Sequence, residues 1–120
     1  ISKNLLNGAA TILKKNKIFT YKKIVAPGVF EIPIIISKNL SKYDAFISLG
    51  CVIKGQTPHF SFISKSSIDA IMNLSVKSKK PIGNGILTCL NYKQALLRSN
   101  PKKKDKGGEA AKAMISVLKL

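Results

Sequence analysis

The chain has 120 residues, of which 45% are hydrophobic and 22% are charged, so it fits one small globular domain, residues 1–120, and is too apolar for a disordered chain. No stretch approaches the roughly 20 apolar residues that a membrane-spanning helix needs, and no apolar leader opens the chain, so we expect a cytoplasmic protein without a membrane partner. One histidine and two cysteines predict neither a structural metal site nor a disulfide framework.

A basic surplus dominates the composition: 21 Lys and Arg stand against five Asp and Glu, for a formal net charge of +16. Such a surplus is the usual footprint of nucleic-acid binding. However, the lysines are scattered, Arg98 is the single arginine, and no aromatic side chains interleave with the charges as a stacking platform needs. We therefore favour a solvated basic surface that attracts anionic ligands, and consider a nucleic-acid partner the weaker interpretation.

The first half of the chain predicts two helices and two strands. Residues 2–16 place apolar side chains at helical spacing, and the short apolar run 24–26 predicts a strand that ends at the turn Pro27-Gly28. Residues 32–40 suit a short helix with a proline near its start. The unbroken apolar run 45–53 predicts a strand buried on both faces.

The second half continues this alternation. Thr57 and Pro58 are typical of an N-cap and an N1 proline, and the helix behind them carries one stripe made of Phe60, Ile63, Ser67, Ile71 and Leu74. The rest of the chain predicts a buried strand, a short helix, a basic loop and an amphipathic helix, at residues 81–89, 91–99, 100–106 and 108–120.

Strands that alternate with helices predict an α/β fold with a parallel sheet covered on both faces. In such sheets, ligands bind beyond the carboxyl ends of the strands. A parallel sheet of three strands that begins with a helix is incomplete, and the chain has no initiator Met, so we expect a further strand before Ile1.

The segment Gly55-Gln56-Thr57-Pro58-His59 is the strongest candidate site. It joins the end of a buried strand to the start of a helix, where free backbone N–H groups can bind an anion. Thr57 adds a hydroxyl, and His59 is the only histidine, the residue type that ordinarily titrates near neutral pH. The alternative is a capped helix with an exposed histidine.

Further candidates are weaker on local grounds. Arg98 offers a guanidinium fork for phosphate or carboxylate, or is retained by chance, and Lys106 offers a second cation or a solvated charge. Phe30 and Glu31 could stack on and hydrogen-bond a planar heterocycle, or could be a core aromatic and a helix-start acid. The two cysteines are most simply small buried hydrophobes.

Five stretches of this sequence, in their order and spacing, resemble the lumazine synthase family: PGVFEIP at 27–33, LGCVIKGQTPHF at 49–60, GILT at 85–88, QALLRS at 94–99 and KGGEAA at 106–111. The resemblance runs from Ile1 to Leu120, and the motifs are specific in combination.

This resemblance implies a flavodoxin-like three-layer sandwich with a parallel sheet whose first strand is missing from this chain. It implies a transferase of riboflavin biosynthesis that condenses 5-amino-6-(D-ribitylamino)uracil with 3,4-dihydroxy-2-butanone 4-phosphate, giving 6,7-dimethyl-8-ribityllumazine, phosphate and water. The implied partners are these small molecules and further copies of the chain, in a pentamer or an assembly of pentamers with sites between subunits. No metal and no organic cofactor is implied.

The resemblance also implies roles for individual residues. His59 matches the proton-transfer residue of the family. The residues that match its pyrimidine and ribityl site are Val29, Phe30, Glu31, Cys51, Val52, Ile53 and Asn84, and those that match its phosphate site are Gln56, Thr57, Arg98 and Lys106. Asn84 departs from the phenylalanine that many members carry at this position, which implies weaker packing against the substrate.

Two alternatives to this function stay open. One is an inactive or shell-forming relative that keeps the oligomer interface without turnover. The other, less favoured, is a basic nucleic-acid-binding domain.

Overall fold

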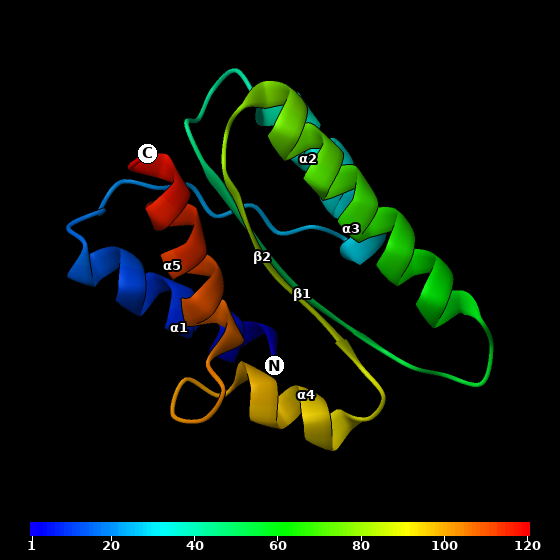
Figure 1. Cartoon of the computed structure of the whole chain (residues 1–120). Helices are drawn as coiled ribbons and strands as arrows, with labels where there is room; N and C mark the ends of the chain where they lie inside the picture. The colour runs from blue at the N-terminus through cyan, green and yellow to red at the C-terminus, as the bar shows by residue number, and fades with distance from the viewer.

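Helices and parallel strands alternate along the chain (Figure 1). This computed structural model describes residues 1–120. Its elements are α1 (Ser2–Lys15), the 3₁₀ helix η1 (Val29–Glu31), α2 (Ile32–Asn39), β1 (Phe46–Ile53), α3 (His59–Ser78), β2 (Ile82–Cys89), α4 (Tyr92–Ser99) and α5 (Lys106–Leu118).

The sheet consists of two parallel strands, β1 and β2, paired from Phe46 opposite Ile82 to Ile53 opposite Cys89. Both strands therefore end at the same edge of the sheet. The connection between them is the 20-residue helix α3, the kind of crossover that parallel pairing requires. The predicted strands 45–53 and 81–89 are thus confirmed, with shifts of one residue at their starts.

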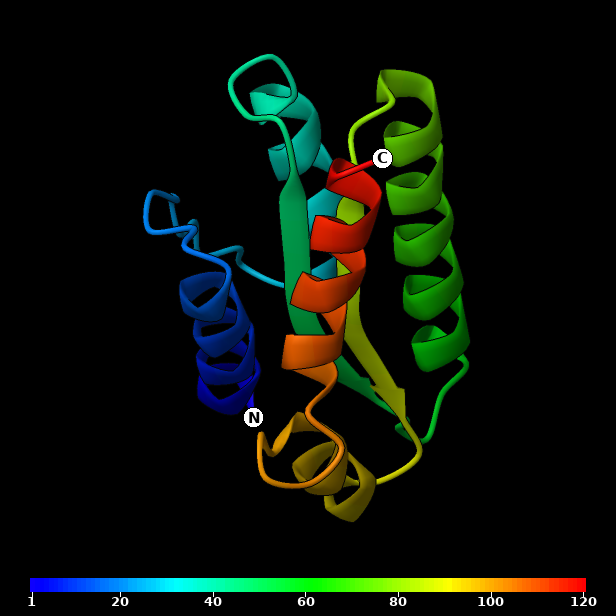
Figure 2. The ribbon, with the colours of Figure 1, turned by 60° about the vertical axis from the view of Figure 1, so that its left-hand side comes forward.

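Helices cover both faces of this sheet and make three layers (Figure 2). Helices α1 and α5 pack together on one face, where Ala9, Ile12 and Leu13 meet Met114 and Ile115. On the other face, α2 and α3 cover the strands with a second apolar cluster made of Ile32, Ile36, Ile71 and Ile86. This architecture is the predicted flavodoxin-like α/β sandwich with a parallel sheet.

Close approach of α5 to β2 depends on Gly83. A Cβ atom at this position would overlap the backbone carbonyl of Ala110 in α5, and it would also lie 3.2 Å from the Cβ of Met114. Glycine at this strand position therefore sets how tightly α5 rests on the sheet.

The predicted strand at 24–26 is not formed. The backbone of residues 19–27 makes no hydrogen bond to any other backbone group, and Ile24 and Val25 are exposed. A strand is defined by its pairing, and this apolar run has no paired neighbour. For the same reason β1 has one unpaired edge, so most of its residues are only half-buried although helices cover both of its faces, and its burial is less complete than predicted.

Helix boundaries differ from the predictions by one or two residues. Pro58 is the N-cap of α3, so this helix begins at His59. Helix α5 begins at Lys106, two residues earlier than predicted, because the Asp105 side chain accepts a hydrogen bond from the N–H of Gly108 at 3.2 Å. None of the helices is both long enough and apolar enough to span a bilayer.

Candidate active site

The carboxyl end of β1 is covered by η1. A Cβ atom at Gly50 of β1 would lie 2.9 Å from Cγ2 of Val29, so the glycine makes room for the valine side chain. Glu31 folds back toward Gly28, with Oε2 3.1 Å from where a Cβ of that glycine would stand. The absence of a side chain at Gly50 therefore lets η1 pack closely against β1, and the absence of one at Gly28 leaves room for the Glu31 carboxylate.

Phe30 and Glu31 line a groove of about 340 Å³ between η1, α2 and α3. The Phe30 ring is 61% exposed, so it is not the core aromatic of the alternative interpretation. Ser67 of α3 also lines the groove, and its buried hydroxyl has no hydrogen-bond partner. An exposed ring and a carboxylate thus share one groove, a mixture that suits a planar polar heterocycle.

The last three residues of β1 are Cys51, Val52 and Ile53, and they lie at the same end of the sheet. Burial, with a smaller effect of the neighbouring Cys89, raises the pKa of the Cys51 thiol to about 11. The thiol is therefore protonated near neutral pH. This favours a packing or binding role for Cys51 over a nucleophilic one.

The loop after β1 presents free hydrogen-bond donors at the start of α3. The backbone N–H groups of Gln56, Thr57 and Phe60 donate to no protein atom. The N–H of His59 donates to the Thr57 hydroxyl at 3.4 Å, and both side chains are exposed. Unpaired N–H groups at the start of a 20-residue helix are the donors that an anion site needs, so this helix start stays the candidate anion site.

Arg98 and Lys106 occupy other elements. Arg98 lies half-buried in the last turn of α4, where Nη1 donates to Sγ of Cys89 at 3.9 Å, a contact too long to hold the guanidinium firmly. Lys106 is the first residue of α5 and pairs with Glu109 at 3.0 Å. Sequence reasoning did not assign Glu109, although its i,i+3 spacing from Lys106 could have signalled the pair.

Asn84 lies exposed on β2, where its Oδ1 accepts a hydrogen bond from the N–H of Ile86 at 3.1 Å. With Lys106 and Glu109 it lines a mostly apolar cavity of about 490 Å³ between α3 and α5. The amide is thus held by its own strand and faces the same cavity as the ammonium group.

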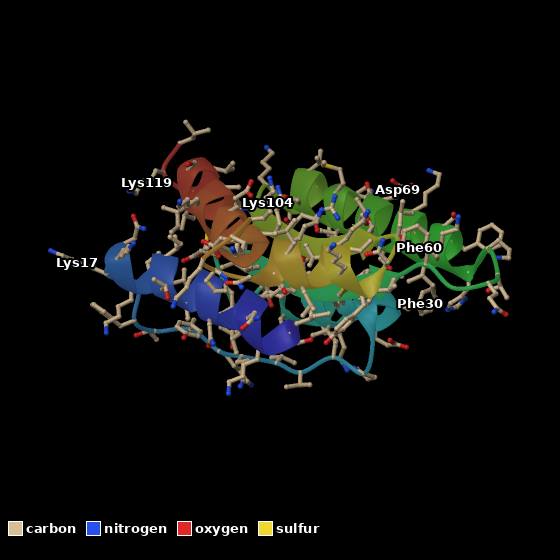
Figure 3. The ribbon with its side chains drawn as sticks, turned by 90° about the horizontal axis from the view of Figure 1, so that it is seen from below. Lys17, Phe30, Phe60, Asp69, Lys104 and Lys119 are labelled. Atoms are coloured by element: carbon tan, nitrogen blue, oxygen red, sulfur yellow. The ribbon has the colours of Figure 1, made fainter.

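The predicted site residues therefore form two groups within one chain. The strand-end group lies at the end of β1 and consists of Val29, Phe30, Glu31, Cys51, Val52, Ile53, Gln56, Thr57 and His59. The second group, which we call the cavity group, consists of Asn84, Lys106 and Arg98. Asn84 and Lys106 line the cavity between α3 and α5, whereas Arg98 on α4 contacts Cys89, the strand partner of Ile53. Figure 3 shows Phe30 and Phe60 near each other at one side, with Lys104, in the loop that leads to α5, well apart from them. No hydrogen bond or ion pair joins the two groups.

The three-layer fold defines an α/β protein, and the polar groups and free N–H donors at the carboxyl end of β1 make that end its candidate small-molecule site. The family model of 6,7-dimethyl-8-ribityllumazine synthase matches residues 1–120. Proteins of this name from Bartonella tribocorum, Bartonella henselae and Agrobacterium fabrum are 42%, 43% and 43% identical to the chain. The alignments cover 100%, 100% and 97% of this chain and 81%, 79% and 82% of the relatives. The chain belongs to the 6,7-dimethyl-8-ribityllumazine synthase family.

Proposed function

We propose that this protein is a transferase of riboflavin biosynthesis that forms 6,7-dimethyl-8-ribityllumazine from 5-amino-6-(D-ribitylamino)uracil and 3,4-dihydroxy-2-butanone 4-phosphate. Membership of the family supports this reaction. The observation that best supports this site is the set of unpaired N–H groups at the start of α3. These groups lie beside His59 and in the same strand-end group as Phe30 and Glu31. A phosphate and a planar heterocycle can then meet at one end of the sheet.

The pyrimidine half of the reaction is assigned to η1 and the end of β1. The exposed Phe30 ring offers a stacking surface, and the Glu31 carboxylate accepts hydrogen bonds from hydroxyl or N–H groups. Val52 and Ile53 supply apolar walls. Holding the amine of this substrate against the ketone of the other removes much of the entropic barrier to their condensation.

The phosphate half of the reaction is assigned to the loop before α3. The N–H groups of Gln56 and Thr57, the Thr57 hydroxyl and the positive end of the helix dipole all favour a bound phosphate. Condensation of the amine with the ketone releases water, and elimination then releases the phosphate and leaves an enol. The enol tautomerises to a new carbonyl, and attack of the second amine on this carbonyl, with loss of a second water, closes the ring. Each of these steps moves protons, and His59 stands next to the phosphate loop as the acid–base group.

Two copies of the chain complete one site. Arg98, Lys106 and Asn84 belong to the phosphate and pyrimidine sites in this proposal, yet Asn84 and Lys106 line the cavity between α3 and α5, which includes no member of the strand-end group of their own chain. A neighbouring copy can bring its cavity group to the strand-end group, as a cyclic homo-oligomer does around a ring. We assign a pentamer, or an assembly of pentamers, as the functional state.

The reaction needs no metal or organic cofactor in this proposal, because an amine, a ketone and a phosphate leaving group already supply its chemistry. We place it in the cytoplasm. Cys51 and Cys89 pack in one cluster as free thiols, which is typical of a reducing compartment.

Appearance of the lumazine product on mixing both substrates with the purified protein tests the function. Turnover that requires both substrates and releases phosphate with product supports it. A well-assembled oligomer that gives no product would instead favour the inactive or shell-forming relative.

Replacing Arg98 by Lys is expected to weaken binding of the butanone phosphate by about 1–3 kcal/mol, or roughly 5- to 150-fold, because a point charge replaces a planar fork. Steady-state kinetics with the phosphorylated substrate varied would show this as a raised KM. Replacement of the exposed Lys93 on the same helix by Gln is the matched control and should change KM less than about twofold. An Arg98→Lys variant with an unchanged KM would remove Arg98 from the phosphate site.

A further inference from the structure

The cavity between α3 and α5 has an apolar wall that is open to solvent. Its volume is about 490 Å³, and its lining comes only from α3, the turn before β2, β2 and α5. Apart from a few polar residues, the wall is aliphatic and includes Ile68, Met72, Ile82, Ala113 and Val117. Met72 is 63% exposed and Val117 is 53% exposed, so water reaches this wall in the single chain. Apolar surface of this kind favours burial against a partner.

Phe62 is an exposed aromatic residue in the first turn of α3. Its side chain is 66% exposed and lines neither this cavity nor the groove that holds Phe30. The backbone N–H of Phe62 donates to the carbonyl of Pro58 at 3.3 Å, which holds the residue within the helix. His59 precedes it by three positions, and residues at this spacing are neighbours on a helix surface. Phe62 therefore projects from the same side of α3 as His59.

The shared site of the proposed function brings the cavity and this side chain together. It requires Asn84 and Lys106 of one copy to contact a substrate that also reaches His59 of the next copy. Both residues line the cavity, so the cavity must lie within the length of one small substrate from His59. Phe62 stands about 4.5 Å further along the same side of α3. A large apolar side chain and an open apolar cavity thus face each other in such an assembly.

We propose that Phe62 of one copy inserts into the cavity between α3 and α5 of the next copy and thereby holds Asn84 and Lys106 against the strand-end group. The contact rests on the proposed function, because the shared site sets which surfaces meet. Phe62 is a positioning residue, since it touches a protein wall and not the substrate. The inserting and receiving surfaces differ, so the contact repeats head to tail and closes as a cyclic oligomer rather than a twofold dimer.

Cross-linking tests the contact directly in the whole assembled protein. We expect Phe62→Cys with Ala113→Cys to be joined between copies by a short bis-maleimide, giving a ladder of covalent oligomers on a denaturing gel. Ala113 is exposed on α5, so a cysteine there is accessible and should leave the fold intact. The matched control combines Ala113→Cys with Tyr92→Cys, which replaces a 60% exposed ring on α4, and should stay monomeric on the gel. A Phe62 pair that does not cross-link in the assembled protein, or equal ladders from both pairs, would overturn the proposal.

Substitutions on both sides of the contact separate it from a general loss of stability. Phe62→Ala should raise the concentration at which half of the protein is assembled by more than about tenfold, whereas Tyr92→Ala should change it less than about twofold. Ala113→Phe fills the cavity from its own chain and should also weaken assembly. Combining Ala113→Phe with Phe62→Ala should restore much of the assembly, because one substitution refills the volume that the other leaves. Analytical ultracentrifugation measures all four, and additive losses with normal circular dichroism would contradict the contact.

The positioning role has its own kinetic signature. At concentrations high enough to assemble Phe62→Ala, the KM for the butanone phosphate should still be raised roughly 3- to 10-fold, because Lys106 is held less firmly at the shared site. Phe62→Leu, which keeps a large apolar side chain, should recover most of both assembly and KM. An assembled Phe62→Ala variant with the wild-type KM would overturn the positioning role.

Failure of this contact and failure of the lumazine reaction give different results. Cross-linking and assembly are measured without substrate, so an oligomer that cross-links through Phe62 and makes no lumazine would refute the proposed reaction and support the contact. A wild-type oligomer that forms lumazine, while the Phe62 pair never cross-links, would support the reaction and overturn the contact.

Discussion

Replacing His59 by Ala is expected to slow lumazine formation by about tenfold to a thousandfold without abolishing it. The imidazole stands beside the unpaired N–H groups that are assigned to phosphate, and it is the only one in the chain. Substrates that are merely held together still react, because proximity removes much of the barrier. Turnover should therefore fall more than substrate affinity does.

The measurement is steady-state kinetics of the His59→Ala variant across about pH 6 to 9, with the oligomer intact. The pH dependence of turnover should flatten in the neutral range, where imidazole is the side chain that ordinarily changes charge. His59 is exposed, so the substitution should not change stability. Wild-type turnover with an unchanged pH profile would leave His59 as a surface residue at a helix start.

Replacing Gly83 by Ala is expected to be the most destabilising single-methyl change in the sheet. The new Cβ would overlap the carbonyl oxygen of Ala110, a backbone atom of a packed helix, so α5 must move away from β2. Overpacking of this kind costs about 3 kcal/mol, which lowers the thermal midpoint by roughly 10 °C for a domain of this size.

Thermal unfolding followed by circular dichroism measures this effect, with Gly55→Ala as the matched control. A Cβ at Gly55 meets nothing within 4 Å, so the same chemical change should shift the midpoint by less than about 2 °C. Equal midpoints for the two variants would contradict the close packing of α5 on β2.

Local sequence signals were sufficient for every element that is stabilised within its own segment or by its neighbour in the sheet. The periodicity of residues 2–16 and the apolar runs 45–53 and 81–89 lead to the observed α1, β1 and β2, whereas the Asp105 cap was not predicted and α5 begins two residues earlier than expected. The run 24–26 shows the limit of such signals, because its composition favours a strand while the segment finds no partner to pair with.

The candidate site was predictable as a list of residues but not as an arrangement. Local spacing indicated the candidate phosphate loop and its histidine, and the motif 27–33 indicated Phe30, which is exposed, and Glu31. Nothing local shows that Asn84 and Lys106 line a separate cavity, because that arrangement depends on where α5 packs against β2.

Sharing of the site between copies can be measured by mixing two defective variants. One variant carries His59→Ala with Glu31→Ala in the strand-end group, and the other carries Arg98→Ala with Lys106→Ala. Each alone should be nearly inactive. After joint unfolding and reassembly in equal amounts, about a quarter of the interfaces in a cyclic oligomer unite two intact halves.

The matched control mixes two variants that are both defective in the strand-end group. One is again His59→Ala with Glu31→Ala, and the other carries Gln56→Ala with Thr57→Ala instead of the Arg98 and Lys106 substitutions. No interface of that mixture has an intact strand-end group, so it should stay inactive. The account predicts recovery to about a quarter of the wild-type rate in the first mixture and none in the second. A first mixture that never exceeds the mean of its two variants would contradict a site built between neighbouring copies.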